Sequence, residues 1–150
     1  MQRLRRLKKL LKLFWRQRRV LLYAYLSLNG IRLALWLFPF KVVRQQLTTL
    51  SVKWGTRSPQ PPISVGAIVW AITATSSFAP RGAKCLVKAL TAQLLLSRYG
   101  HPHQVHIGVA MDATQTLEAH AWVEYEDRVI MGDLNDLSRF KPLSATGVKI

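Results

Sequence analysis

The chain has 150 residues, 49% of them hydrophobic, which is long and apolar enough to build the core of one domain and excludes a disordered chain. Its single cysteine, Cys85, excludes an internal disulfide framework and a cysteine-rich zinc cluster, and is typical of a reducing compartment. Lysine and arginine total 22 against 7 acidic residues, a net charge of +15, and every acidic residue lies between Asp112 and Asp136. This separation indicates that residues 112–136, which hold all the acidic side chains, have a function distinct from that of the basic part of the chain.

The first 19 residues combine nine basic side chains with an apolar stripe. The stripe has three- and four-residue spacing, which predicts a basic amphipathic helix. Its members are Leu4, Leu7, Leu11 and Phe14. Such a helix binds an anionic membrane or an acidic peptide or partner. The alternative is a helix that docks on its own domain and turns its basic face to water.

Residues 20–40 are apolar enough to raise the question of a membrane span. Arg32 lies near the middle, and a central arginine costs about 2.5–3.5 kcal/mol on insertion scales. Asn29-Gly30 is a good turn between helices, so we predict two helices, near 4–28 and 31–50. A single membrane anchor is the alternative, and the lack of a small-residue cleavage site argues against a removable signal peptide.

The polar, proline-rich segment 56–62 predicts an extended linker, with a boundary between a basic helical region (1–57) and a second domain (58–150). Residues 63–78 have helical spacing and few polar positions, which predicts a buried helix. A second helix begins at Cys85, with Gly100 as its C-cap residue, so the thiol lies in the first turn.

After Gly100 the apolar period changes from helix to strand. Alternation predicts strands over 104–109 and 117–125 and a third strand that begins with residues 128–131, and therefore an α+β domain. Glu126-Asp127 forms the short loop of a hairpin between the last two strands. A two-residue loop makes His120 oppose Asp133, and opposed side chains share a face about 4.5–5.5 Å apart.

Cys85, His120 and Asp133 are the parts of a nucleophilic site. Helix N–H groups favour a thiolate and supply an oxyanion hole, a histidine exchanges the proton, and a carboxylate fixes the histidine tautomer. Each residue also has an ordinary structural interpretation: a small buried cysteine, a satisfied histidine, and a turn aspartate after a strand. Asp136 is the alternative acid, and Trp122 shares a face with His120, where it either shields the site or belongs to the core.

Other chemistry has weaker support. His101, His103 and His106 are close in sequence, but no carboxylate or cysteine lies beside them, so no metal and no cofactor are expected. The basic residues lie on predicted helices and are not interleaved with aromatic residues on a strand face, so no nucleic-acid partner is expected either.

Several stretches together resemble one family. They are Lys84-Cys85-Leu86-Val87-Lys88-Ala89-Leu90, Gln93-Leu94-Leu95, His106-Ile107-Gly108-Val109, Glu118-Ala119-His120-Ala121-Trp122-Val123-Glu124 and Gly132-Asp133. Over residues 65–143 the chain resembles the C-terminal, transglutaminase-like cysteine peptidase part of the lasso-peptide biosynthesis B proteins. Two positions depart from the pattern: Lys84 stands where arginine is frequent, and Glu126-Asp127 replaces the usual Asp-Gly.

The resemblance implies a papain/transglutaminase-like core, with a cysteine-bearing helix on an antiparallel sheet, and a triad of Cys85, His120 and Asp133. It implies removal of the leader from a ribosomally made precursor peptide through a thioester, beside a separate leader-recognition protein and the lasso cyclase. We expect a cytoplasmic protein with possible membrane-surface contact through residues 1–40. The alternatives are a transglutaminase-like acyl transferase and a non-catalytic basic protein that binds membranes or peptides.

Overall fold

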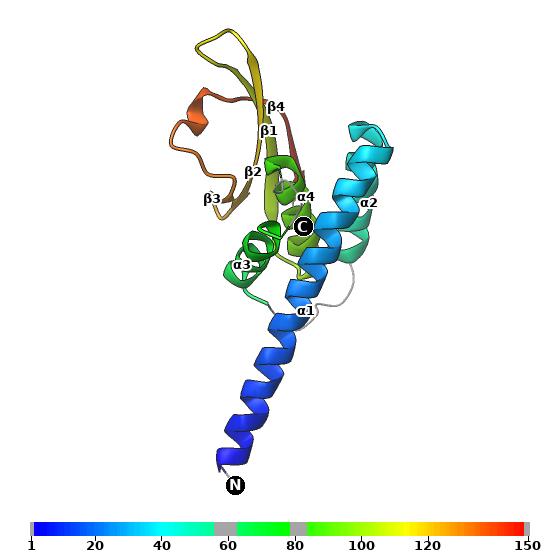
Figure 1. Ribbon diagram of the computed structural model, residues 1–150, viewed down its shortest axis with the longest axis vertical. Coiled ribbons are helices and arrows are strands. Elements are labelled where there is room, and N and C mark those ends of the chain that lie inside the picture. Colours follow the sequence, from blue (N-terminus) through cyan, green and yellow to red (C-terminus); the bar gives the residue numbers. More distant parts are fainter. Residues whose placement is uncertain (1, 56–62, 79–83, 149–150) are drawn as a thin grey trace.

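The computed structural model describes residues 2–55, 63–78 and 84–148. The elements in chain order are α1 (Gln2–Leu37), α2 (Phe40–Gly55), α3 (Val65–Ser76), α4 (Cys85–Arg98), β1 (His103–Met111), β2 (Leu117–Tyr125), β3 (Arg128–Met131), a short 3₁₀ helix η1 (Leu137–Arg139) and β4 (Lys141–Val148). The strands form one antiparallel sheet in the order β3-β2-β1-β4 (Figure 1). The predicted α+β class is confirmed, whereas the predicted linker and the boundary between residues 57 and 58 lie outside the described residues.

The predicted turn at Asn29-Gly30 is wrong, because α1 runs without a break from Gln2 to Leu37. The Asn29 side chain donates to the Tyr25 carbonyl one turn back, at 2.9 Å, and so finds its partner within the helix and not in a turn. The helix ends one residue before Phe38-Pro39, where proline lacks the N–H that a continuing helix needs. The Pro39 carbonyl then accepts from Val42 and Val43 at the start of α2.

Helix α4 is the central element of the molecule, and nearly all of its residues from Val87 to Ser97 are buried. It packs against α1, α2 and α3 on one side and against the sheet on the other (Figure 1). Gly100 has a φ of 73°, and the N–H groups of Gly100 and His101 bond the carbonyls of Ser97 and Leu96. This glycine-dependent cap confirms the predicted end of the helix and directs the chain into β1.

One hydrophobic core joins the four helices to β1, β2 and β3. It combines Val20 and Leu28 of α1 and Leu47 of α2 with Leu90 of α4 and Val123 of β2. The opposite face of the sheet carries a smaller cluster, made by Ala110, Trp122 and Phe140. The first 55 residues therefore contribute directly to the core on which the sheet is built.

The β2–β3 hairpin has the predicted loop, but not the predicted register beyond it. Glu126 and Asp127 both have positive φ, 49° and 60°, as a tight hairpin turn requires. Glu124 pairs with Val129, but Val123 pairs with Met131, so one extra residue is inserted in β3. This bulge shifts the register by one, and β3 ends at Met131, so His120 does not oppose Asp133.

Strand β4 was not predicted from the sequence. Its residues, from Lys141 to Val148, include Pro142 and Gly147, which are both unfavourable in strands. The strand pairs with β1 at the sheet edge and contains a register shift opposite Ile107 and Gly108. An edge position and an irregularity are where a strand tolerates proline, which explains why periodicity alone did not reveal it.

Candidate active site

Cys85 is the first residue of α4, as predicted. Lys84 precedes it in an extended conformation, and its side chain does not cap the helix. The first hydrogen bond of the helix runs from the Lys88 N–H to the Lys84 carbonyl. The N–H groups of the first turn therefore have no partner inside the helix. Cys85 thus lies at the positive end of the helix dipole, where a negative charge is stabilised.

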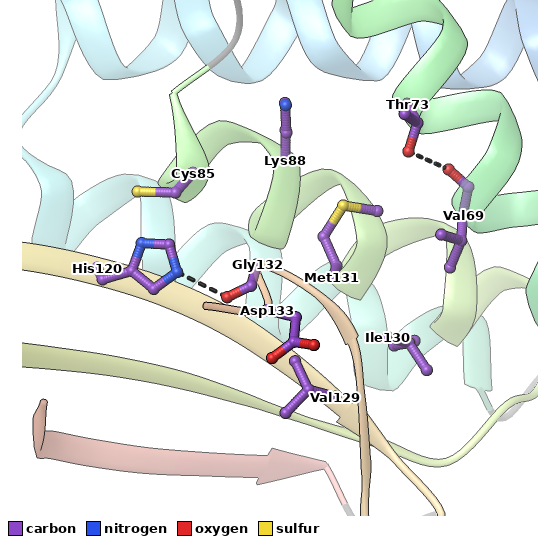
Figure 2. Close-up of a pocket in the computed structure, with 10 residues that line it drawn as sticks. All are labelled: Val69, Thr73, Cys85, Lys88, His120, Val129, Ile130, Met131, Gly132 and Asp133. Atoms are coloured by element: carbon purple, nitrogen blue, oxygen red, sulfur yellow. Dashed lines mark hydrogen bonds between the residues drawn. The ribbon is translucent and has the colours of Figure 1, made fainter. Parts of the chain in front are cut away.

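The thiol opens into a cavity of about 450 Å³ between α3, α4 and the end of β3. Its lining residues are Val69, Thr73, Cys85, Lys88, His120, Val129, Ile130, Met131, Gly132 and Asp133 (Figure 2). All three residues of the predicted triad thus reach one pocket. The pocket has an apolar wall from α3 and β3 and a polar end at Cys85 and His120.

His120 lies on β2 beyond the point where β3 ends, so that edge of β2 is open to the cysteine-bearing helix. Its Nε2 lies 2.7 Å from the Gly132 carbonyl oxygen. A carbonyl only accepts, so Nε2 carries the proton and Nδ1 of the neutral ring keeps a lone pair. Figure 2 shows the nitrogen that is not bonded to Gly132 on the side of the ring that faces the Cys85 sulfur.

No hydrogen bond joins Sγ of Cys85 to the His120 ring in the described part of the chain. The two groups face each other across the pocket (Figure 2). Catalytic hydrogen bonds are often long in an unliganded site and shorten when substrate is bound. The arrangement therefore suits a thiol and a base that act on a group placed between them.

The predicted bond between His120 and Asp133 is not present among the described contacts. The hairpin bulge places the Gly132 carbonyl at Nε2 instead, and the Asp133 carboxylate lies on the same pocket wall, exposed to solvent (Figure 2). Gly132 makes this possible, because its φ is 78° and a Cβ there would lie 2.5 Å from the Ala121 carbonyl. Asp136, the alternative acid, pairs with Arg139 at 2.6 Å and does not line the pocket.

Two aromatic rings hold the His120 imidazole in place. Trp122, two residues along the same strand face, stacks with it at a centroid distance of 6.4 Å, and Phe140 lies 5.4 Å away on another side. A Cβ on Gly108 would lie 3.0 Å from the indole, so the glycine makes room for that ring. Trp122 is thus both a member of the smaller core cluster and a neighbour of the site, which combines the two predicted interpretations.

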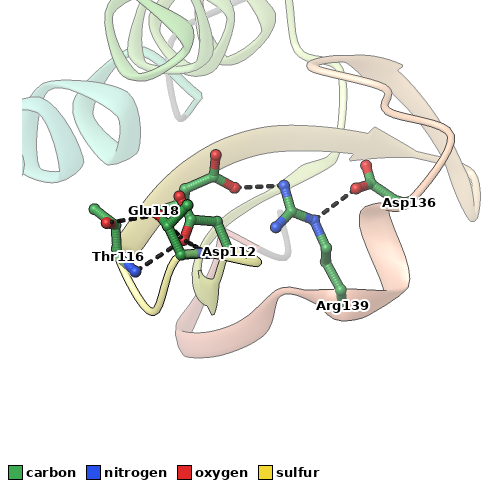
Figure 3. A network of polar contacts seen from close by, with 6 residues as sticks. Asp112, Thr116, Glu118, Asp136 and Arg139 are labelled. Carbon is green, nitrogen blue, oxygen red and sulfur yellow. Dashed lines mark hydrogen bonds and ion pairs between the residues drawn. The ribbon is translucent and has the colours of Figure 1, made fainter.

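A polar network fixes the segment that carries Phe140 (Figure 3). Arg139 pairs with Asp136 and with Glu118 of β2, and its guanidinium lies 4.6 Å from the Phe140 ring centroid. In the adjoining β1–β2 loop, the Thr114 hydroxyl and the Thr116 N–H bond the Asp112 carboxyl and hold its pKa below the usual range. Three of the seven acidic residues, Asp112, Glu118 and Asp136, therefore have a structural role beside the site.

Sequence reasoning missed Gly132, Arg139 and Phe140 as contributors to the site. Gly132 belongs to the motif Gly132-Asp133, but a sequence does not indicate which side chain a backbone carbonyl will bond. Arg139 and Phe140 follow the predicted strands, in a segment without periodicity. Their opposite charges are the only sequence feature that connects Arg139 to Glu118 of β2, with which it forms an ion pair.

The three neighbouring histidines have separate roles. Nε2 of His101 lies 2.6 Å from the Ile63 carbonyl, Nδ1 of His103 lies 2.9 Å from the His101 carbonyl, and His106 pairs with Glu124 at 3.2 Å. Within residues 2–55, 63–78 and 84–148, no group of three or more histidine, cysteine or acidic side chains is arranged to hold a metal ion.

A thiol on a helix N-terminus that faces an imidazole on an antiparallel sheet is an arrangement used by thiol hydrolases and acyl transferases. The sequence profile of the transglutaminase-like superfamily matches residues 26–145, and the chain belongs to this superfamily. The superfamily includes cysteine peptidases and acyltransferases. No curated protein and no solved structure matches the chain.

Proposed function

We propose that the chain is a cysteine peptidase that removes the leader from a lasso-peptide precursor. The observation that carries the proposal is the shared pocket of Cys85 and His120, in which Nε2 of the histidine is already bonded and Nδ1 faces the thiol. The resemblance of the stretches around both residues to the lasso-peptide B proteins supports the choice of substrate. Membership of the transglutaminase-like superfamily supports the thiol chemistry.

In the proposed reaction, His120 takes the Cys85 proton at Nδ1 and the sulfur attacks the carbonyl carbon of the leader–core bond. The N–H groups of the first turn of α4 stabilise the oxyanion. When the tetrahedral intermediate collapses, the C–N bond breaks and His120 gives the proton to the departing amine of the core peptide. The leader is then held as a thioester on Cys85.

The second half of the reaction regenerates the enzyme. His120 removes a proton from water, the hydroxide attacks the thioester, and the leader leaves as a carboxylic acid while the sulfur regains its proton. The Gly132 carbonyl fixes the tautomer throughout, and Asp133 supplies a negative charge on the same wall that favours the transient imidazolium. Cys85, His120 and Asp133 form the proposed triad, with Gly132 as the group that orients the ring.

A separate leader-recognition protein is proposed to present the precursor, and the lasso cyclase to take the released core. The proposed compartment is the cytoplasm, because a free thiol such as Cys85 is kept reduced there. These partners follow from the family resemblance, and the pocket geometry concerns only the cutting step.

The test mixes the full chain with a lasso precursor and its leader-binding protein, and follows leader release by mass spectrometry. Cys85→Ala and His120→Asn should abolish release, while Met111→Gln, an exposed substitution at the far end of β1, should leave it unchanged. Thermal unfolding of each variant confirms that the fold is retained. An intact precursor with the unaltered protein and all partners present would overturn the proposal.

A primary amine added to the same reaction separates peptidase from acyl transferase. Both activities pass through the thioester, and only the nucleophile that resolves it differs. A leader that ends in a free acid supports the peptidase, whereas a leader joined to the amine at the expense of the acid would contradict it.

A further inference from the structure

Helix α1 is apolar on two opposite faces. Val20, Ala24, Leu28 and Ile31 form one face, which is buried against α3 and α4. The other face carries large side chains that are more than half exposed. They are Trp15 (60%), Leu22 (56%), Leu26 (57%), Leu33 (55%) and Leu37 (56%), which we call the α1 stripe. Their spacing of seven and four residues places them on one side of the helix.

The exposed apolar surface continues past the end of the helix. Trp36 is 80% exposed, and Phe38, Phe40 and Val42 extend the surface around the corner into α2. Single exposed apolar residues are ordinary, but a contiguous row of this length is not. Such a surface on a folded chain indicates a partner that covers it.

Charge identifies the partner. The first 111 residues contain no aspartate or glutamate, and nine lysines and arginines in residues 1–19 lie on the same continuous helix as the stripe. Arg18 and Arg19 are exposed where the stripe begins. A bilayer with anionic headgroups offers both matching surfaces at once: acyl chains for the leucine and tryptophan side chains, and negative charge for the basic segment.

The helix is long enough to cross a bilayer, because Gln17–Leu37 has the length and hydropathy of a span. The packing argues for a different placement. One face of this segment is part of the core shared with α3 and α4, so lipid could surround the helix only if the domain came apart. Arg32, within the same segment, adds a further cost to a crossing.

We propose that the α1 stripe and the basic N-terminal segment dock the protein on an anionic bilayer, with α1 parallel to the membrane plane. The face of α1 that would contact the bilayer is opposite the face that packs on α3 and α4. Those two helices line the Cys85 pocket. The pocket therefore remains open to water-soluble peptides while the protein is docked. The proposal stands on exposure and charge, and is independent of the peptidase activity.

The experiment measures flotation of the full chain with vesicles of phosphatidylcholine alone and of phosphatidylcholine mixed with phosphatidylglycerol. We expect binding to the anionic vesicles that falls as salt is raised, and weak binding to the neutral ones. The double variant Leu26→Gln with Leu33→Gln should reduce binding by at least about tenfold, since affinity scales with the apolar area inserted. The matched control, Met111→Gln with Leu117→Gln, removes equally exposed side chains from the sheet and should not change binding.

Four results would overturn the proposal. Equal binding to neutral and anionic vesicles would show that charge does not select the membrane. Unchanged vesicle binding by the Leu26→Gln/Leu33→Gln variant would show that the α1 stripe does not contact lipid. Resistance to extraction by alkaline carbonate would indicate a helix that crosses the bilayer. A stable dimer in sedimentation that this double variant dissociates, without vesicle binding, would show that a second copy covers the stripe instead.

Discussion

At the scale of single residues, the chemistry of the site depends on a backbone atom. In a nucleophile–histidine–carboxylate triad the carboxylate holds the ring tautomer, and its replacement by an amide costs about 10⁴-fold in rate. Here the Gly132 carbonyl occupies that position at Nε2 of His120. A carbonyl accepts from only one tautomer, so it orients the ring as a carboxylate does, but it adds no full negative charge.

This arrangement predicts a small effect for a change at the acid. Asp133→Asn should lower the rate of leader release by no more than about tenfold, because the tautomer is already fixed and only a solvent-screened charge is lost. Single-turnover rates at saturating precursor would measure the loss. His120→Asn, made in parallel, should leave no measurable release.

Gly132→Ala is the informative comparison. A Cβ there would lie 2.5 Å from the Ala121 carbonyl and 3.0 Å from Cα of Trp122, so the carbonyl that holds His120 must move. We expect this variant to lose more activity than Asp133→Asn. If Asp133→Asn alone proved as damaging as His120→Asn, the carboxylate would be the orienting group and the carbonyl bond secondary.

His103 gives a second prediction at this scale. It is buried, its Nδ1 donates to the His101 carbonyl, and its Nε2 has no hydrogen-bond partner among the residues that the structure describes. Burial is the main cause that lowers the pKa of His103 below its ordinary value of 6.5. Because the unfolded chain takes up the proton more readily, the stabilisation by neutral His103 is complete above about pH 6.5 and decreases as the pH falls.

The measurement is the free energy of unfolding in urea at pH 7.5 and pH 5.5. The unaltered chain should be less stable at the lower pH, and His103→Gln should reduce that difference by removing the group that titrates. A pH dependence that is the same in both proteins would show that His103 is not its source.

At the scale of elements, the local sequence predicts most of the architecture. The strand over 117–125, the start of the next strand at Arg128 and the helix that begins at Cys85 follow from periodicity and from capping residues, and the structure confirms these three predictions. The loop at Glu126-Asp127 was also predictable, because hairpin length restricts turn chemistry. These features depend on residues that are close in sequence, and that is why hydrophobic periodicity, capping residues and loop length predict them.

Features that depend on packing could not be predicted in this way. The bulge in β3 is one such feature, because a register count from the loop has no means of including an inserted residue. Asn29-Gly30 has the composition of a turn, but the apolar face of α1 is continuous across it and the core keeps the helix intact. Tertiary burial outweighs a local turn preference of about 1 kcal/mol.

The interior of α1 provides a direct test. Gly30 is helical, and an added Cβ would meet no atom of the described residues within 4 Å. Gly30→Ala should therefore raise the free energy of unfolding by about 0.5–1 kcal/mol, measured by chemical denaturation. Gly100→Ala is the matched control, because Gly100 has a φ of 73° at the end of α4 and alanine there should destabilise the protein. A loss of stability at position 30 equal to that at position 100 would indicate a turn at Asn29-Gly30 after all.

At the scale of the whole molecule, the four helices share one core with β1, β2 and β3. α4 lies between α1 and α2 on one side and the sheet on the other (Figure 1). The helix that carries Cys85 is therefore buried on both sides, and its position relative to His120 depends on the N-terminal helices as much as on the sheet. This coupling gives the first 55 residues a structural task, in addition to the proposed membrane contact.

The last prediction concerns where the chain can be shortened. A protein that begins at residue 58, the predicted boundary, loses five large buried side chains from α1 and α2: Val20, Leu28, Ile31, Val43 and Leu47. Each contributes about 1.5–3 kcal/mol by burial, and the total approaches the roughly 5–15 kcal/mol that stabilises an entire domain. We expect residues 58–150 alone to show no cooperative thermal unfolding.

The control is a protein that begins at Gln17, which keeps every one of these side chains. It should unfold cooperatively, at a temperature close to that of the full chain. Circular dichroism during heating measures both, and a cooperative transition for 58–150 would establish that domain as an independent folding unit and contradict the shared core.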